Sequence, residues 1–365
     1  MKIEEFYKLI KDILQIDREG DLFPSHLNKL FGAYIVSCED IDEAYFNNAT
    51  EKKALISQIE KVCKMIEDCL RLYSSAKLDE SIALMREILK HDSFCAYKVK
   101  QESIWYRSRL VDGRERVLPA KEMFHVPFEL VRKIGNNRFS ISGYPCLYLS
   151  NTIWACWEEM KEPGLEDFCT SMVKPTKDID LLDLRFPNNN YNQKIENVLY
   201  SLPLIIACSV EVEYPHDPFK PEYVIPQIVM LALVNHERFQ GCSFTSTKKV
   251  ENFDWPDDLL CNIAMPVRSV NEKGLCPNLA SCFKISNSIN YKYEVLKCNI
   301  APIRAISHND MLEILEAGPH IEPTAYEDYE GSLFGQMEKL LKENQEVSLL
   351  DTTDKKEFDL GCVLE

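Results

Sequence analysis

The sequence predicts an α+β protein, in which a helical N-terminal region precedes a mixed, largely antiparallel β-sheet module with flanking helices. Three observations support this class. Residues 1 to about 93 carry apolar side chains at helical spacing. From about residue 100 the chain changes to short runs rich in β-branched and aromatic residues, separated by turn residues. These strands and helices do not alternate regularly, as they would in a doubly wound fold with a parallel sheet.

The N-terminal region, residues 1–95, is expected to form a helical domain. A first amphipathic stretch runs through Leu14, and a polar break follows between Asp17 and Pro24. Further along, residues 49–73 place a row of apolar side chains on one helical face: Leu55, Ile59, Val62, Ile66 and Leu70. A layer of packed helices is the expected product.

The middle of the chain, residues 96–300, is expected to form the sheet module. Mostly alternating apolar and polar side chains predict strands at residues 104–110, 145–150, 178–185, 241–247 and 262–268. Helices are predicted at residues 152–161, 195–210 and 225–235, and a proline-punctuated loop at 211–223. Residues 301–365 form a C-terminal extension, with helices predicted at 309–318 and 332–345 and an acidic tail after them.

Composition and charge exclude several classes of function. The chain has 58 acidic and 42 basic residues, and its formal net charge of −16 is the wrong sign for a protein that binds a nucleic-acid backbone. No window approaches the roughly eighteen uninterrupted apolar residues of a membrane span, and the N-terminus lacks the apolar stretch of a signal peptide. We therefore expect a cytoplasmic protein with neither a nucleic acid nor a membrane as partner.

Cysteine and histidine spacing argues against a metal site. The 14 cysteines include no CxxC pair and the 7 histidines are dispersed, so we expect reduced, buried thiols and no metal. The phosphate-loop, dinucleotide-binding, zinc-protease and serine-hydrolase motifs are also absent. Any chemistry must come from dispersed residues on strand ends.

One stretch, residues 135–160, carries a denser pattern of a glycine and an arginine, a turn glycine, a Pro-x-x-Tyr strand and a helix with a glutamate. The matching residues are Gly135, Arg138, Gly143, Pro145, Tyr148 and Glu159 or Glu158. This signature stretch resembles that of the RES domain family, which is named after an arginine, a glutamate and a serine. The resemblance extends over residues 96–295, and it departs from the family at Phe139 and Ser140, where a tryptophan and an asparagine are common.

Two thinner matches lie outside the signature stretch. The family's arginine should come from the strand at 104–110, as Arg107 or, less favourably, Arg109. Its serine should come from the run at 241–247, as Ser246. Gln227 falls where related sequences carry a glutamine before a helix.

The resemblance implies a fold like that of the ADP-ribosyltransferase toxins and an enzyme that degrades NAD, which is its substrate. Such proteins often act as the toxin of a toxin-antitoxin pair, so a neutralising protein partner is implied as well. The chemistry is the cleavage of the N-glycosidic bond between nicotinamide and ribose. Nicotinamide leaves as a neutral molecule, and the rate is limited by the positive charge that develops on the ribose.

The resemblance also assigns roles to the matching residues. Glu159 would stabilise the charge on the ribose, and Arg107 with Arg138 would bind the diphosphate through the guanidinium fork. Tyr148 would offer a flat face to nicotinamide or ribose, and Ser246 would orient a ribose or the carboxamide. Gly143 suits a turn, or a close approach of the backbone, just before the strand.

The choice between Glu158 and Glu159 depends on the helix that carries them. Adjacent helical residues project about 100° apart, so the two cannot point into one cleft in the same way. Taking Ile153, Cys156, Trp157 and Met160 as the apolar face, we expect Glu159 at the edge of that face and Glu158 on the polar side, in water.

Other readings of the sequence remain open. The protein could transfer ADP-ribose to a protein target rather than to water or phosphate, or it could be a non-catalytic interaction module with a degenerate RES-like part. Arg86 and His91 also match the short motif of a family of small helical ribonucleases, which the acidic charge disfavours. The role of the N-terminal helices and the oligomeric state, including a homo-oligomer, are left open.

Overall fold

The computed structural model describes residues 1–111, 117–187, 193–246, 260–290, 329–330 and 332–352. The chain divides into two compact units. One, here the helical unit, comprises Met1–Lys98, Asn136–Ile141 and Asp180–Val250. The other, here the sheet unit, comprises Val99–Gly135, Ser142–Ile179 and Glu251–Glu365. The protein is of the α+β class that the sequence predicts.

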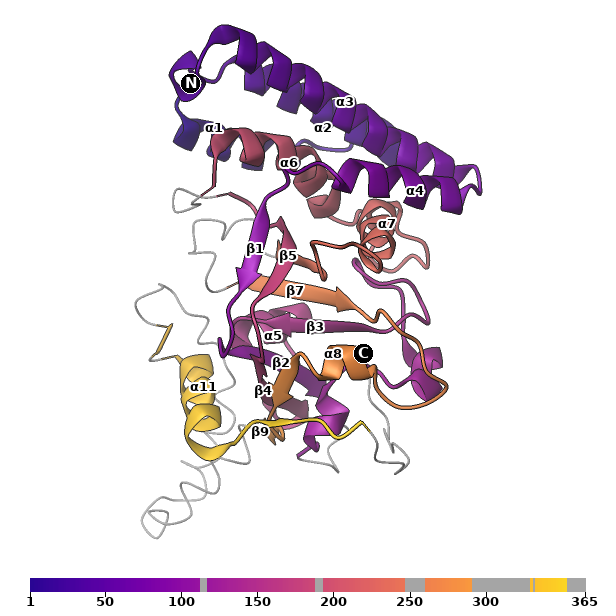
Figure 1. Ribbon diagram of the computed structural model, residues 1–365, viewed down its shortest axis with the longest axis vertical. Helices are drawn as coiled ribbons and strands as arrows, with labels where there is room; N and C mark the ends of the chain where they lie inside the picture. Colours follow the sequence, from indigo (N-terminus) through magenta and orange to yellow (C-terminus); the bar gives the residue numbers. More distant parts are fainter. Residues whose placement is uncertain (112–116, 188–192, 247–259, 291–328, 331, 353–365) are drawn as a thin grey trace. The chain divides into compact units, whose positions relative to one another are not determined.

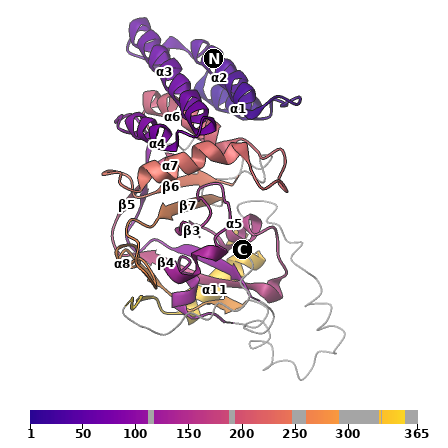
Figure 2. The same cartoon turned by 90° about the vertical axis from the view of Figure 1, so that its right-hand side faces the viewer.

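The helical unit is built on four N-terminal helices and two later ones. They are α1 (Ile3–Leu14), α2 (Phe23–Glu39), α3 (Ala49–Ser74), α4 (Leu78–Leu89), α6 (Ile195–Ser209) and α7 (Val224–Leu233). The side chain of Asn48 caps α3 by accepting from the Glu51 amide at 2.9 Å, and Pro24 stands in the first turn of α2, where the predicted polar break ends. Helix α3 packs on α6 and α4 packs on α7 (Figures 1 and 2).

Three strands complete the helical unit: β1 (Ala96–Val99), β5 (Ile179–Leu184) and β6 (Cys242–Thr245), in the order β1-β5-β6. Strands β5 and β6 are parallel, with Asp183 opposite Ser243, because the chain crosses over through α6 and α7 between them. The chain first passes from the helical unit to the sheet unit between Lys98 and Val99, near the boundary predicted at residue 95, and it later returns, so that α1–α4 share their unit with α6 and α7. As the extent of a family domain, residues 96–300 stay a prediction.

The sheet unit holds an antiparallel sheet in the order β7-β3-β2-β4-β8-β10, with β9 paired to β4. The strands are β2 (Trp105–Leu110), β3 (Cys146–Ser150), β4 (Phe168–Pro175), β7 (Cys261–Pro266), β8 (Phe283–Ile285), β9 (Ile289–Asn290) and β10 (Ser348–Leu349). The predicted strands at 104–110, 145–150 and 262–268 are confirmed as β2, β3 and β7. The long β4, which pairs with β2 from Trp105 to Leu110, is absent from the sequence prediction.

Helices α5 (Ile153–Glu159), α8 (Pro277–Ala280) and α11 (Leu333–Asn344) belong to the sheet unit. The hydroxyl of Thr152 caps α5 by accepting from the Ala155 amide at 3.1 Å. Helix α11 confirms the helix predicted at 332–345. It packs on α5, where the ring centres of Phe334 and Trp157 are 5.3 Å apart. The helix predicted at 309–318 lies outside the described residues.

Candidate functional site

The signature stretch contributes to both units. Its first part, Asn136–Ile141, belongs to the helical unit, and the rest forms the turn, strand and helix of the sheet unit. Gly143 has φ of +79°, a left-handed conformation that side chains rarely adopt, and its amide donates to the Ile134 carbonyl at 3.2 Å. The prediction of a turn glycine before β3 is therefore confirmed.

Arg138 lies at the end of α6 in the helical unit. Its Nη1 donates to the carbonyls of Cys208 and Val210, each at 2.9 Å, and its guanidinium lies 5.2 Å from the centre of the Tyr223 ring. The last carbonyls of a helix have no partner within the helix, so a cation at this place stabilises the helix end. Arg138 thus has a structural role that the sequence did not indicate, and its binding of a diphosphate stays a prediction.

Gln227 in α7 holds the turn that carries Arg138. Its amide Nε2 donates to Asn136 Oδ1 at 2.6 Å and to the Asn137 carbonyl at 2.9 Å, with the Ser140 carbonyl at 3.4 Å. The side chain is buried, and the amide at this position fixes the Asn136–Ser140 turn against the helix. Gln227 lies inside α7 rather than before a helix.

Ser246 follows the end of β6 and is buried. Two residues earlier, Phe244 packs against Phe139 with ring centres 4.5 Å apart, so the segment with Arg138 meets the strand that leads to Ser246. These two predicted site residues therefore share the helical unit.

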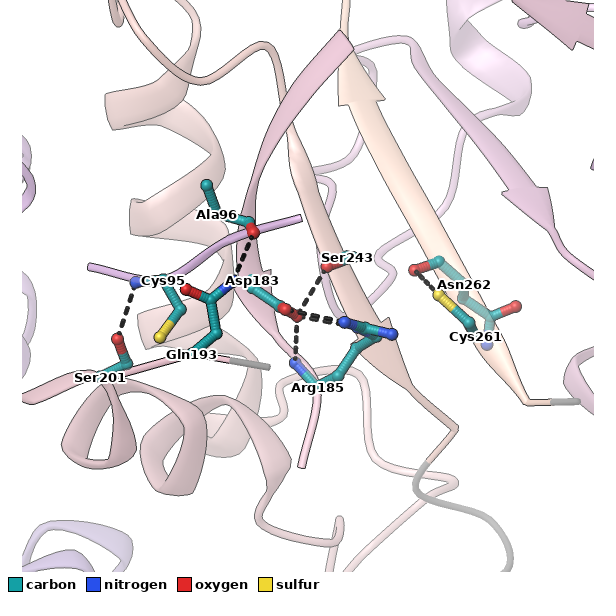
Figure 3. Close-up of polar contacts among 9 residues, drawn as sticks. All are labelled: Cys95, Ala96, Asp183, Arg185, Gln193, Ser201, Ser243, Cys261 and Asn262. Atoms are coloured by element: carbon teal, nitrogen blue, oxygen red, sulfur yellow. Dashed lines mark hydrogen bonds and ion pairs between the residues drawn. The ribbon is translucent and has the colours of Figure 1, made fainter. Parts of the chain in front are cut away.

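A polar cluster on β5 and β6 escaped the sequence analysis. Asp183, which is 1% exposed, accepts from Arg185 Nε and Nη2 at 2.9 Å each and from the Ser243 hydroxyl at 3.0 Å (Figure 3). The Arg185 guanidinium also lies 4.1 Å from the centre of the Tyr97 ring. A buried carboxylate with this many donors is fully compensated, and we assign the cluster to the packing of the parallel strands.

The two arginines of β2 differ in their surroundings. Arg109 is 4% exposed and its Nη2 donates to the Phe124 carbonyl at 2.8 Å, so it belongs to the interior. Arg107 is half-buried, and its Nη1 donates to the backbone carbonyl of Tyr148 on β3 at 3.3 Å. Burial, with the charges of both arginines nearby, lowers the pKa of His125 to about 4. Of the two, only Arg107 retains the exposure that a ligand contact requires.

Arg107 and the backbone of Tyr148 are in contact where β2 and β3 pair over only a short length. Strand β2 pairs with β3 at Tyr106 and Ser150, whereas on its other edge β2 pairs with β4 along its whole length. By strand alternation, Tyr148 and Ser150 share the face of Tyr106, and Arg107 projects from the opposite face.

Helix α5 reverses the expected environments of its two glutamates. Glu158 is 3% exposed and accepts from Trp154 Nε1 at 2.9 Å, whereas Glu159 is exposed. The expectation that Glu158 faces water is wrong: its carboxylate lies beside Trp154, which is buried in the core that α5 and α11 share. Glu159 is thus the carboxylate of this pair that a ligand can reach.

The carboxylate of Glu159 is held by a residue of a neighbouring strand. Asn262 on β7 donates from Nδ2 to Glu159 Oε1 at 3.0 Å, and its Oδ1 accepts from the Ser150 hydroxyl at 2.5 Å. Sequence reasoning missed Asn262, although one signal was available: an amide side chain stands inside the otherwise apolar run of a predicted strand.

Three further expectations concern metals, membranes and thiols. In the part of the chain that the structure describes, no group of histidine, cysteine and acidic side chains could hold a metal ion. Across the same ranges, every helix is too short or too polar to cross a membrane. The cysteines of these ranges all lie in the interior, where burial raises the pKa of the Cys146 thiol to about 12.

The two residues of the alternative ribonuclease motif lie at the surface of the helical unit. Arg86 is exposed on α4, and His91 is exposed after it, with its ring stacked on Tyr200 at 4.3 Å. These are two solvated residues near a helix end.

Comparison with known proteins gives one relative. No family model matches the chain, and no solved structure matches it. A protein of Bacillus subtilis (strain 168) named "Putative toxin YopC" is 27% identical over 358 residues, which cover 88% of this chain and 76% of that protein. The chain is therefore similar, along most of its length, to a protein named as a toxin.

Proposed function

We propose that this chain is a toxin that degrades NAD by cleaving the bond between nicotinamide and ribose. Two findings support the proposal at different levels. The similarity to a protein named as a toxin covers most of the chain. The resemblance of residues 135–160 to the RES signature supplies the reaction, and the observation that carries it is the exposed carboxylate of Glu159, oriented by Asn262 at the end of α5.

The position of Glu159 favours a functional role over a stabilising one. It is the last residue of α5, where the helix carbonyls give a partial negative charge, and no basic residue stands in the last turn. A carboxylate at this end of a helix costs about 0.3–1 kcal/mol, although less in a helix as short as this one. Positions that break a local stability rule are typical of functional sites.

The main requirement of the reaction is a negatively charged group of the protein fixed beside the ribose. The C1′–N bond breaks with its electron pair going to the nicotinamide ring, which leaves as a neutral molecule. Positive charge develops on the ribose C1′ and ring oxygen, and a fixed carboxylate stabilises it. Water or phosphate then adds to C1′, and water loses a proton to the solvent as it does so.

The diphosphate of NAD requires cations, and Arg107 is our candidate in the sheet unit. A guanidinium presents several N–H groups in a rigid fork, so a bond to the Tyr148 carbonyl is compatible with a bidentate contact to phosphate. Arg109 is the less favoured of the two β2 arginines, because its guanidinium is buried and donates to the Phe124 carbonyl. Arg138 and Ser246 are the candidates in the helical unit, and the neutralising partner belongs to the same proposal.

The test is to incubate the purified full-length chain with NAD, with and without phosphate, and to separate the products by chromatography. We expect free nicotinamide together with ADP-ribose, or with a phosphorylated ADP-ribose when phosphate is the acceptor. Intact-mass analysis of added proteins distinguishes transfer to a protein target, which would add ADP-ribose to them. A folded protein that releases no nicotinamide under any of these conditions would overturn the proposal.

A further inference from the structure

We propose that Asn262 is the positioning residue for the Glu159 carboxylate, acting through a directed chain of hydrogen bonds from Ser150. This inference rests on the proposed function, because it assigns a role in the same reaction. Asn262 is 3% exposed and lies in β7 directly opposite Ser150 of β3. Its side-chain amide connects strands β3 and β7 to the end of α5.

The direction of the chain is fixed by its donors and acceptors. The Glu159 carboxylate can only accept, so Nδ2 of Asn262 must face it, and Oδ1 then accepts from the Ser150 hydroxyl. The opposite orientation of the amide would place Oδ1 against a negatively charged oxygen, and the two would repel. The two bonds are therefore compatible with one orientation of the amide, in which Nδ2 lies 3.0 Å from Glu159 Oε1.

The backbone around Asn262 leaves the amide little freedom. Residue 262 is held in the β3–β7 ladder, which runs over Cys146–Ser150 and Cys261–Pro266. Next to it, the Asn151 side chain accepts from the Cys261 amide at 3.1 Å, and the Asn151 amide donates to the Cys261 carbonyl at 3.0 Å. Figure 3 shows Cys261 and Asn262 together on β7.

Packing alone does not explain an asparagine here. The neighbouring positions Ile263 and Ala264 on β7 are apolar and completely buried. Burial of an amide costs free energy that hydrogen bonds only just offset, so an apolar residue would serve the sheet equally well. What an apolar residue cannot do is orient an exposed carboxylate, and a charge oriented before the reaction needs no reorganisation as positive charge develops.

The first experiment measures kcat and KM for NAD in the parent and in Asn262→Ala. We expect kcat to fall about 10- to 100-fold, the rate equivalent of one hydrogen bond to a charged group, with KM changed less than about 3-fold. Asn290→Ala is the matched control. Asn290 is a buried asparagine of β9 whose Nδ2 donates to the Leu165 and Glu166 carbonyls, away from Glu159, so its loss should lower stability and leave kcat unchanged.

The second experiment repeats Asn262→Ala in the Glu159→Gln background. If Asn262 acts through the Glu159 carboxylate, kcat of the double variant should lie within about 3-fold of that of Glu159→Gln alone. Should Asn262→Ala fail to fold, Ser150→Ala removes the donor that orients the amide and should lower kcat about 3- to 10-fold, again only when Glu159 is intact.

The outcomes separate the two proposals. A folded parent that does not turn over NAD refutes the proposed function and, with it, the positioning role. An active parent in which the effects of Asn262→Ala and Glu159→Gln multiply, or in which Asn290→Ala lowers kcat equally, refutes the positioning role alone.

Discussion

Replacement of Glu338 by alanine should detach α11 from α5. Glu338 lies in α11 and is 8% exposed. Its Oε2 accepts from the Tyr106 hydroxyl at 3.0 Å, and its Oε1 accepts from the Tyr329 hydroxyl at 2.7 Å and from the Ile153 amide at 3.1 Å. Burial, and then the nearby Glu338 carboxylate, raises the pKa of both tyrosines, so their hydroxyls stay protonated and remain donors. One side chain therefore joins the C-terminal extension to the first turn of the signature helix.

The size of the effect follows from these bonds. Hydrogen bonds to a charged group contribute about 1.5–3 kcal/mol each, but the buried carboxylate loses its own hydration, which offsets part of the sum. Glu338→Ala leaves three buried donors, and also the partly exposed Lys342 ammonium, without this acceptor, so we expect a loss of about 3–5 kcal/mol, the range typical of a broken buried polar network. Glu338→Gln keeps one acceptor oxygen and should lose about half as much.

Urea unfolding followed by tryptophan fluorescence is the assay, because Trp154 and Trp157 lie in the core that α5 and α11 share. We expect the fluorescence transition of Glu338→Ala to move to lower urea, with Glu338→Gln between it and the parent. Alanine and parent transitions that coincide to within about 0.5 kcal/mol would refute this account of how α11 is held.

Three further predictions concern pH, the buried glutamate and the helix end. Burial lowers the pKa of His125 from 6.5 to about 4, so between these pH values the unfolded state binds more protons than the folded state. The free energy of unfolding should therefore fall by up to about 3 kcal/mol as the pH drops from 6.5 to 4. His125→Gln should lose this pH dependence in urea titrations. Glu158→Ala should leave the Trp154 N–H buried without its acceptor and cost about 1–3 kcal/mol in the same assay, with Glu158→Gln much milder. Arg138→Lys should weaken the end of α6 by about 1 kcal/mol and also weaken NAD binding in calorimetry, while binding like that of the parent would remove Arg138 from the diphosphate site.

The strands that the sequence predicted are those in which apolar and polar side chains alternate, or in which turn residues mark both ends of the strand. Strand β4 lacked both signals. All its side chains except Lys174 are buried, so alternation disappears, and cysteine, serine and methionine interrupt the β-branched pattern. Strands β9 and β10 are two residues long, too short for any periodic signal.

The site was predictable in part for a similar reason. The turn at Gly143, strand β3 and helix α5 follow from local patterns, and these are where the sequence prediction was confirmed. The environment of Glu158 was not predictable, because its partner Trp154 is buried in a core that includes residues of α11, far along the chain. The bond from Asn262 to Glu159 also joins segments far apart in sequence, so no local pattern contains it.

The most direct test of the central claim is a side-by-side measurement of kcat for NAD cleavage in the parent, Glu159→Gln and Glu158→Gln. Glutamine keeps the shape of each side chain and removes its charge. We expect Glu159→Gln to lower kcat about 100- to 1,000-fold with little change in melting temperature, because the side chain is exposed, and Glu158→Gln to retain most of the activity. The reverse ranking would transfer the role to Glu158, and two variants as active as the parent would contradict the carboxylate mechanism altogether.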